Sequence, residues 1–223
     1  MNVILFGATG MVGQGVLREC LLDDGVERVL LVSRTGIGYE NRKLKELVLP
    51  DLFDFSPEVE QVRDYDACFF CLGVSAAGLS EEQYRHITFD LTLRVADTLA
   101  FINPGMVFTY VSGAGTDSSE RGRAMWARVK GATENALLKL PFKAAYMFRP
   151  GIIQPLHGIR SKTPAYQAFY TATGWLLPPL RRLFPNQILT TEDMGRAMLA
   201  AVRHGAPKPL LEIADIRALS SAR

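Results

Sequence analysis

Three glycines near the start of the chain have a spacing suited to holding phosphate groups. Gly7, Gly10 and Gly13 follow an apolar run at residues 3–6, and an amphipathic stretch and a second apolar run at 28–32 come next. A strand, a glycine turn, a helix and a strand in this order place a pyrophosphate at the N-terminus of the helix. Gly7 permits the tight turn, Gly10 lets backbone N–H groups approach the phosphates, and Gly13 lets the helix pack close to the strand. The predicted phosphate-binding residues are Gly7, Thr9, Gly10, Met11, Val12 and Gly13.

The turn after the second apolar run indicates which dinucleotide binds. Its residues are Ser33, Arg34 and Thr35, and they include no acid. Sites for NAD usually place an Asp or Glu here to accept a hydrogen bond from the ribose 2′-hydroxyl, whereas an arginine can pair with the 2′-phosphate of NADP. Ser33 and Arg34 therefore favour NADP(H) over NAD. The alternative is that Arg34 is an ordinary solvated charge in a loop.

Further turns are expected at the same edge of the sheet. Asp51 and Leu52 follow the third apolar run and are predicted to face the adenine, with Asp54 as a rival in the same loop. The segment Leu72-Gly73-Val74 follows the fourth run and is expected to lie against the adjacent ribose. Open parallel sheets bind ligands beyond the carboxyl ends of their strands, so these turns should meet.

The apolar runs alternate with helical patterns along most of the chain. The runs are at residues 3–6, 28–32, 46–49, 67–72, 106–111 and 144–148, and the clearest helical patterns cover 81–102 and 121–140. This alternation is typical of an α/β protein with a parallel sheet covered on both faces. We therefore expect one Rossmann-type, doubly wound domain over residues 1–223, in which 1–148 form the cofactor-binding core.

The remaining residues, 149–223, are expected to form a small substrate-side lobe and the closing elements. Six of the twelve prolines lie within 149–190, and residues 166–184 are apolar and aromatic, which favours a pocket lid or a subunit contact. Thr190 or Thr191 is expected to cap a helix, followed by a short strand at 210–213 and a terminal helix.

Composition excludes several classes of function. The 223 residues are 48% hydrophobic and 22% charged with a net charge of +2, which gives no reason to expect nucleic-acid binding. No apolar run reaches the roughly 18 residues of a membrane span, and residues 1–6 lack the features of a signal peptide. We therefore expect a cytoplasmic protein with reduced thiols.

Cys68 and Cys71 fall in one strand pattern and should point to opposite faces of the sheet, and Cys20 is expected to be a core residue.

Several of these segments resemble the short-chain dehydrogenase/reductase superfamily, in particular its extended and atypical branch of epimerase/dehydratase-like proteins. The matches run in order over about two thirds of the chain. Within that branch, Cys71-Leu72-Gly73, Val129-Lys130-Gly131 and Phe148-Arg149-Pro150-Gly151 are most similar to the Tat-interacting tumour-suppressor subgroup and its bacterial relatives. The resemblance implies a Rossmann fold, bound NADP(H) and a carbonyl or alcohol substrate. It implies no particular reaction, because the branch includes reductases, epimerases and cofactor-sensing regulators.

The resemblance also implies a set of catalytic residues. In such enzymes a Tyr lies four residues before a Lys, whose ammonium lowers the phenol pKa and holds the nicotinamide ribose, and a Ser orients the substrate oxygen. Ser112 and Lys130 match, and the backbone of Pro150, Gly151 and Ile152 should approach the nicotinamide. The tyrosine position is Trp126, whose indole can donate a hydrogen bond or stack but has no proton to exchange.

The sequence offers other candidate proton donors and leaves two functions open. Tyr110 precedes Ser112 on the same strand and is expected to lie in the core, and Asp117 and Ser118 lie in the loop at 113–122. His86, His157 and His204 show no metal-ligand spacing, although His157 could contact a substrate. The first hypothesis is an NADP(H)-dependent oxidoreductase with a non-standard proton donor. The second is a regulatory protein that binds NADP(H) as a redox signal with little turnover. Either could act with a second copy or a protein partner.

Overall fold

The computed structural model describes residues 1–54, 56–159 and 187–222. Seven strands form a parallel sheet in the order β3-β2-β1-β4-β5-β6-β9. This order reverses between β1 and β4, as in a doubly wound Rossmann sheet. The strands are β1 (Asn2–Phe6), β2 (Arg28–Ser33), β3 (Leu44–Val48), β4 (Ala67–Phe70), β5 (Val107–Val111), β6 (Ala144–Phe148) and β9 (Leu210–Leu211). The predicted fold class is confirmed.

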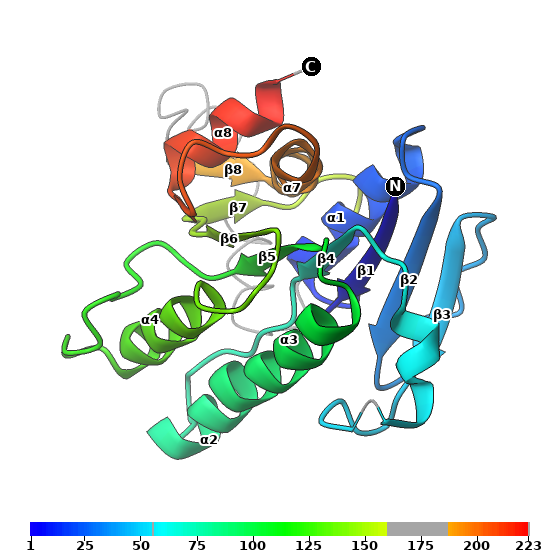
Figure 1. The fold of residues 1–223 in the computed structure, drawn as a ribbon. Helices are drawn as coiled ribbons and strands as arrows, with labels where there is room; N and C mark the ends of the chain where they lie inside the picture. Colours follow the sequence, from blue (N-terminus) through cyan, green and yellow to red (C-terminus); the bar gives the residue numbers. More distant parts are fainter. Residues whose placement is uncertain (55, 160–186, 223) are drawn as a thin grey trace.

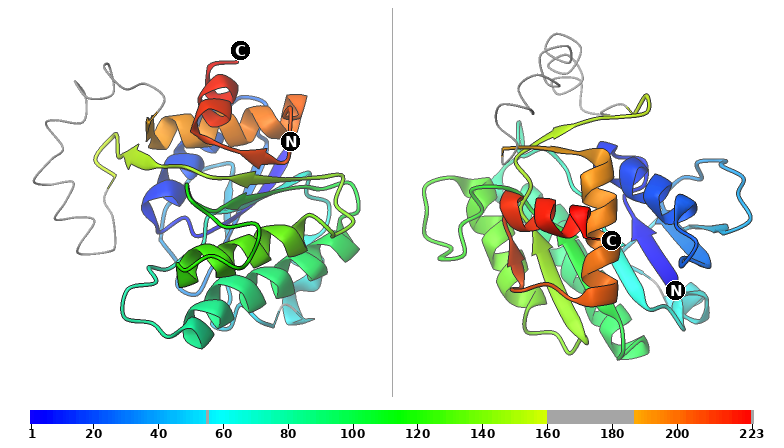
Figure 2. Two further views of the ribbon diagram at one scale, coloured as in Figure 1. Left: turned by 90° about the vertical axis from the view of Figure 1, so that its left-hand side faces the viewer. Right: turned by 90° about the horizontal axis from the view of Figure 1, so that it is seen from above.

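Helices cover both faces of the sheet (Figures 1 and 2). One face carries α1 (Met11–Leu22), α7 (Thr191–His204) and α8 (Ile213–Ser221). The other carries α3 (Leu91–Ile102) and α4 (Met125–Leu137). Both faces of the strands are apolar because both are buried: Val3 and Leu5 of β1 belong to the first core cluster, and Ile4 and Phe6 to the second.

Two helical patterns differ in detail from the prediction. The helix expected at 81–102 consists of α2 (Glu81–Arg85), a π-helical segment (His86–Asp90) and α3. The helix expected at 121–140 begins only at Met125, because Asp117 accepts hydrogen bonds from the backbone N–H groups of Ser119 and Gly122 and holds that segment as a loop. A short 3-10 helix (Ser56–Val62) precedes β4.

The described part of the predicted lobe contains two strands that the sequence did not indicate. β7 (Ile152–Gln154) and β8 (Ile188–Thr190) form a separate parallel pair. Thr190 caps α7, and its side chain and that of Asp193 form a reciprocal capping box. Thr190 was one of the two residues predicted as the cap. The apolar stretch at 166–184 lies outside the described residues.

The cysteine prediction is confirmed by the two core clusters. Cys68 lies in the cluster under α3, whereas Cys71 packs on the opposite cluster with Cys20. Burial raises the pKa of all three thiols, so they stay protonated and behave as small apolar side chains. No described helix is long and apolar enough to cross a membrane.

Candidate cofactor and catalytic site

The glycine turn has the shape that the spacing predicted. Gly7 has a φ of +78°, and a Cβ there would lie 2.5 Å from the backbone nitrogen of Leu72. A Cβ at Gly13 would lie 2.2 Å from the carbonyl oxygen of Gly7, so α1 approaches the turn as closely as two backbones can. The Gly10 N–H donates to the Gly7 carbonyl at 2.9 Å and closes the turn.

The N-terminus of α1 is open to an anion. Gly10 is its N-cap and provides no side-chain cap, and the first turn carries no acidic residue. Within the described residues, the N–H groups of Met11, Val12 and Gly13 have no hydrogen-bond partner. Unpaired N–H groups at a helix N-terminus, together with the helix dipole, favour a phosphate. This part of the chain therefore fits the pyrophosphate of a dinucleotide.

The strand register brings the other predicted cofactor residues to this same edge. Phe6 pairs with both Val32 and Phe70, and Val111 pairs with Phe148, so the turns that follow these strands are neighbours. Leu52 is buried in the core, and its turn keeps both candidate acids, Asp51 and Asp54, exposed; Asp51 accepts a hydrogen bond from the Phe53 N–H at 2.9 Å. The further residues of this edge are Ser33, Arg34, Leu72, Gly73, Val74, Pro150, Gly151 and Ile152.

Arg34 is exposed at the carboxyl end of β2, and no acid follows that strand directly. The Ser33 hydroxyl donates to the carbonyl of Thr35 at 2.8 Å, which turns the chain sharply after the strand. Val74 and Ile152 are 41% and 45% exposed, large values for apolar side chains beside a sheet edge. Exposed apolar groups at a ligand edge are surfaces that a bound molecule can cover.

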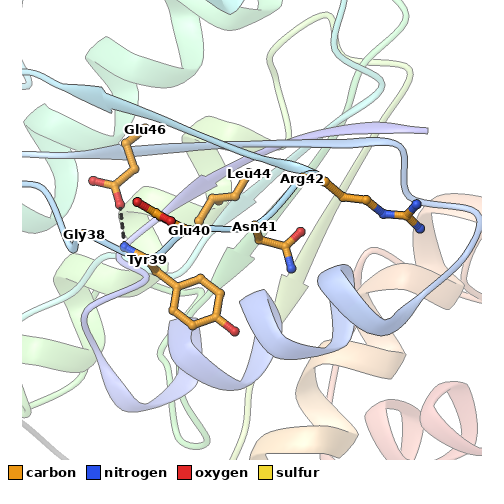
Figure 3. A pocket seen from close by; sticks show the side chains of 7 residues that line it. All are labelled: Gly38, Tyr39, Glu40, Asn41, Arg42, Leu44 and Glu46. Atoms are coloured by element: carbon orange, nitrogen blue, oxygen red, sulfur yellow. Dashed lines mark hydrogen bonds between the residues drawn. The ribbon is translucent and has the colours of Figure 1, made fainter.

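An open hollow of about 630 Å³ lies beside the connection from β2 to β3 (Figure 3). Its shape follows from Glu46, whose carboxylate accepts hydrogen bonds from the N–H groups of Ile37 and Tyr39. It contains none of the predicted cofactor residues, so we do not assign the site to it. Its lining residues are Gly38, Tyr39, Glu40, Asn41, Arg42, Leu44 and Glu46.

The three predicted catalytic residues lie together at the end of β5. The Lys130 Nζ donates to the carbonyl oxygens of Val111 and Ser112, both at 3.2 Å, so α4 is fastened to the strand end. The Trp126 ring lies 3.7–3.9 Å from the positions that a Cβ on Gly113 or Gly115 would occupy. It therefore packs on the loop that carries Ser112.

Ser112 has a hydroxyl partner that the sequence reasoning missed. The Ser112 Oγ lies 2.9 Å from the Thr116 Oγ1, and Thr116 donates to the carbonyl of Gly113 at 2.8 Å. Both side chains are buried. The sequence feature that could have indicated this pair is a threonine four residues after the candidate serine, in a glycine-rich loop.

A second missed feature is an ion-pair network around Arg149. Its guanidinium donates to both carboxylate oxygens of the fully buried Glu134, at 3.0 and 2.5 Å, and to Glu212 at 3.1 Å. It also donates to the Ser118 Oγ at 2.6 Å. The paired carboxylates raise the pKa of Arg149. One side chain thus joins the end of β6, α4, the start of α8 and the loop after β5.

The alternative proton donors from the sequence are placed in structural roles. Tyr110 is 1% exposed, as expected of a core residue, and burial raises its pKa far above the usual range. Hydrogen bonds from Ser119 and Gly122 lower the pKa of Asp117, which keeps that carboxylate ionised. Ser118 accepts a hydrogen bond from Arg149.

Two of the histidines have side-chain partners in the structure. His157 has a φ of +56° and its Nε2 lies 2.6 Å from a carboxylate oxygen of Glu192. His86 stacks on Phe53, with ring centroids 4.7 Å apart. In residues 1–54, 56–159 and 187–222 no group of His, Cys, Asp and Glu side chains is arranged to hold a metal ion.

Comparison with known proteins gives homologues but no match to a protein-family model. The chain is 29% identical over 159 residues to the mitochondrial protein fmp52 of Emericella nidulans, a match that covers 68% of this chain and 66% of that protein. It is 27% identical to the mitochondrial protein fmp52-2 of Aspergillus terreus, over 89% of this chain and 85% of that protein. It is 26% identical to HTATIP2 of Rattus norvegicus, over 68% and 62% respectively.

These relatives correct one expectation. The sequence predicted a cytoplasmic location, but the Fmp52 relatives from Emericella nidulans, Aspergillus terreus, Scheffersomyces stipitis and Candida albicans are all named mitochondrial. The lack of a recognisable signal peptide was the reason for the prediction, and it does not distinguish between compartments inside the cell. The cytoplasmic prediction is therefore wrong.

Solved structures share the fold at low sequence identity. The Bordetella bronchiseptica enzyme WbmF in complex with NAD⁺ aligns with a TM-score of 0.67 at 14% identity, over 99% of this chain and 76% of that one. The UDP-glucose 4-epimerase of Thermotoga maritima aligns with a TM-score of 0.66 at 14% identity, over 99% and 81%. The chain thus has homologues in the Fmp52 and HTATIP2 proteins and the Rossmann fold of the epimerase/dehydratase-like short-chain dehydrogenases/reductases, in agreement with the resemblance seen in the sequence.

Proposed function

We propose that this protein is an NADP(H)-dependent oxidoreductase that acts on a small carbonyl or alcohol substrate. One observation carries the proposal: the open N-terminus of α1 and the Ser112–Lys130 pair lie at the same edge of one parallel sheet. A dinucleotide whose pyrophosphate binds at the first would reach the second with its nicotinamide end, since ligands of such sheets cross the carboxyl ends of the strands.

Each part of the cofactor has residues suited to hold it. The helix N-terminus would hold the pyrophosphate, Ser33 and Arg34 the 2′-phosphate, and the Asp51 turn the adenine. The remaining contacts would come from Leu72, Gly73 and Val74 to the adjacent ribose and from Lys130, Pro150, Gly151 and Ile152 to the nicotinamide riboside. When bound, the cofactor would supply or accept a hydride.

The protein's own contribution is to orient the substrate and to place charge beside the reacting oxygen. The Ser112 hydroxyl donates to Thr116 Oγ1, because the proton of Thr116 goes to the Gly113 carbonyl, and a bound substrate oxygen would take the place of Thr116 as the acceptor of the Ser112 proton. The half-buried Lys130 places a positive charge next to the same point, where negative charge develops on the oxygen during reduction. The exposed Ile152 offers an apolar surface for the nicotinamide ring.

A second function is favoured by Trp126. The indole at the tyrosine position is too weakly acidic to give up its proton, so the alternative is a protein that binds NADP(H) and reports its redox state to a partner with little turnover. The two functions differ in whether bound NADPH is consumed.

The experiment follows binding first and turnover second. Purified protein is titrated with NADPH and with NADH while intrinsic tryptophan fluorescence is recorded, and NADPH loss is then followed with quinones, aldehydes and ketones. Binding with oxidation by at least one carbonyl class supports the oxidoreductase. Binding without oxidation across the panel supports the redox sensor and refutes the enzyme.

NADP selectivity is tested with Arg34→Ala and the matched control Arg42→Ala, an exposed arginine on the same connection. A hydrogen bond to a charged group contributes roughly 1.5–3 kcal/mol, so Arg34→Ala should weaken NADPH binding about tenfold or more and leave NADH binding unchanged. Arg42→Ala should change neither. Equal affinity of the unmodified protein for NADH and NADPH would refute the assignment of Arg34.

A further inference from the structure

If the chain reduces a carbonyl group, it needs a group that protonates the substrate oxygen. In the described part of the chain the obvious acids near Ser112 are occupied otherwise. The Tyr110 phenol is enclosed in the core, and the Asp117 carboxylate is held ionised by its own loop. Serine and threonine hydroxyls are too weakly acidic to give up a proton alone.

Trp126 occupies the position where the enzymes that this chain resembles carry tyrosine, and it cannot protonate the substrate oxygen. Its ring lies against the loop at Gly113 and Gly115, and its indole N–H can donate a hydrogen bond but is far too weakly acidic to give up its proton. The ring does cover the loop next to Ser112, and Lys130 follows one helical turn later on the same face of α4.

Lys130 has the geometry of a proton donor. Its ammonium has three N–H bonds, of which two are directed to the carbonyl oxygens of Val111 and Ser112. Those bonds hold the nitrogen at the end of β5, beside the residue that would orient the substrate oxygen. Within the described residues the third N–H has no hydrogen-bond acceptor, and the ammonium lies 5.3 Å from the centre of the Tyr110 ring.

We propose that the Lys130 ammonium donates the proton to the substrate oxygen when the carbonyl is reduced, in place of the missing tyrosine. This inference rests on the proposed oxidoreductase function. A bound reduced nicotinamide would supply the hydride for the carbonyl carbon, the π electrons of the C=O bond would move to oxygen, and that oxygen would take its proton from Nζ of Lys130. The products are the alcohol, the oxidised nicotinamide and a neutral amine, which regains a proton from water.

The surrounding charges keep this ammonium available at neutral pH. Burial lowers the pKa of Lys130 to about 8, and the carboxylate of Glu134, four residues later on α4, opposes that shift. Arg149 neutralises much of that carboxylate from the end of β6, and Tyr110 on β5 is neutral. An acid whose pKa lies near the working pH is both present in its protonated form and ready to transfer the proton.

The test uses the full chain with a carbonyl substrate from the panel above. Lys130→Arg keeps the positive charge but removes an acid that can lose its proton, Lys130→Gln removes both, and Lys139→Gln changes an exposed lysine just beyond α4. Circular dichroism and melting temperature show which variants are folded. The rate constant kcat, KM and the affinity for NADPH are measured from pH 6 to pH 10.

The expected result separates proton donation from cofactor positioning. In the unmodified protein, kcat for reduction should fall as the pH rises through about 8. Lys130→Arg should bind NADPH with an affinity changed by less than about threefold, but lose on the order of 100-fold in kcat, the lower range for general acid catalysis, together with that pH dependence. Lys139→Gln should behave like the unmodified protein.

A measurement without turnover tests the same lysine. Competitive labelling with acetic anhydride, read by peptide mass spectrometry, should show Lys130 titrating well below the usual lysine value of 10.5. A Lys130 that titrates at 10.5, or a folded Lys130→Arg variant that keeps more than a tenth of kcat, would overturn the inference alone. Lack of NADPH consumption by the unmodified protein with every carbonyl would overturn the proposed oxidoreductase function as well.

Discussion

The Arg149–Glu134 ion pair gives the sharpest test of how this site is held together. The Glu134 side chain is fully buried and that of Arg149 is 10% exposed, so water cannot replace either partner. Glu134→Gln preserves the size of the side chain and removes its charge. The guanidinium then keeps one carboxylate partner, Glu212, whose side chain is 48% exposed, with the amide oxygen and the Ser118 hydroxyl as neutral acceptors.

The magnitude follows from the burial of the pair. Breaking a buried ion pair by removing one partner costs about 3–5 kcal/mol, mainly because the other charge stays desolvated. Glu212 compensates in part, so we expect a loss of about 3 kcal/mol in the free energy of unfolding. For a chain of this length each kcal/mol lowers the melting temperature by roughly 2–4 °C, which gives a decrease of about 6–12 °C.

The assay is urea unfolding followed by circular dichroism, with the surface pair Arg63–Glu60 as the control. Those side chains are 46% and 74% exposed, and Glu60→Gln should leave the free energy of unfolding nearly unchanged because water screens the pair. The double variant Glu134→Met with Arg149→Met should recover part of the loss, since no charge then remains buried. A Glu134→Gln variant within about 1 kcal/mol of the unmodified protein would refute the reasoning.

Three further changes test the neighbouring contacts. Gly131→Ala should destabilise the protein by about 2 kcal/mol or more in urea unfolding, because the added Cβ would lie 1.8 Å from the carbonyl oxygen of Asp117; an unchanged midpoint would contradict this close approach. Thr116→Val should lower kcat while the affinity for NADPH, measured by fluorescence titration, stays within about twofold, because the change removes the hydroxyl that is hydrogen-bonded to Ser112. An equal loss of kcat and of NADPH affinity would indicate general disruption of the site instead. Lys130→Met should raise the melting temperature more at pH 7 than at pH 9.5. The cost of burying the ammonium is fully present below its folded pKa of about 8 and fades as the pH rises toward the unfolded value of 10.5. The same gain in melting temperature at both pH values would show that this cost is absent.

Much of the fold could be predicted because its rules are local. Alternating apolar runs and helical patterns indicate parallel strands with crossover helices, and such crossovers are right-handed, which leaves few strand orders. The Cys68 and Cys71 prediction succeeded for a similar reason, since side chains alternate along any strand. The β7–β8 pair was missed because its two strands are only three residues each and lie far apart in the sequence.

The glycine turn and the set of residues at the sheet edge were determined by the sequence alone. The absence of a Cβ allows two backbones to approach more closely than any other residue would, so the meaning of Gly7 and Gly13 does not depend on the rest of the fold. The sequence likewise determined that the side chain at position 126, an indole, is too weakly acidic to act as the proton donor.

Only the tertiary structure decided what the polar side chains of the site do. In the sequence Arg149 is only one residue of a motif, and the structure shows it at the centre of an ion-pair network with Glu134. Lys130 is only a matched lysine in the sequence, and the structure shows its nitrogen bound to the carbonyl oxygens of Val111 and Ser112. Asp117 and Ser118 changed from candidate acids to structural residues in the same way. The reason is physical: hydrogen bonds and charges act over a few ångströms between residues distant in sequence, and burial sets their strength.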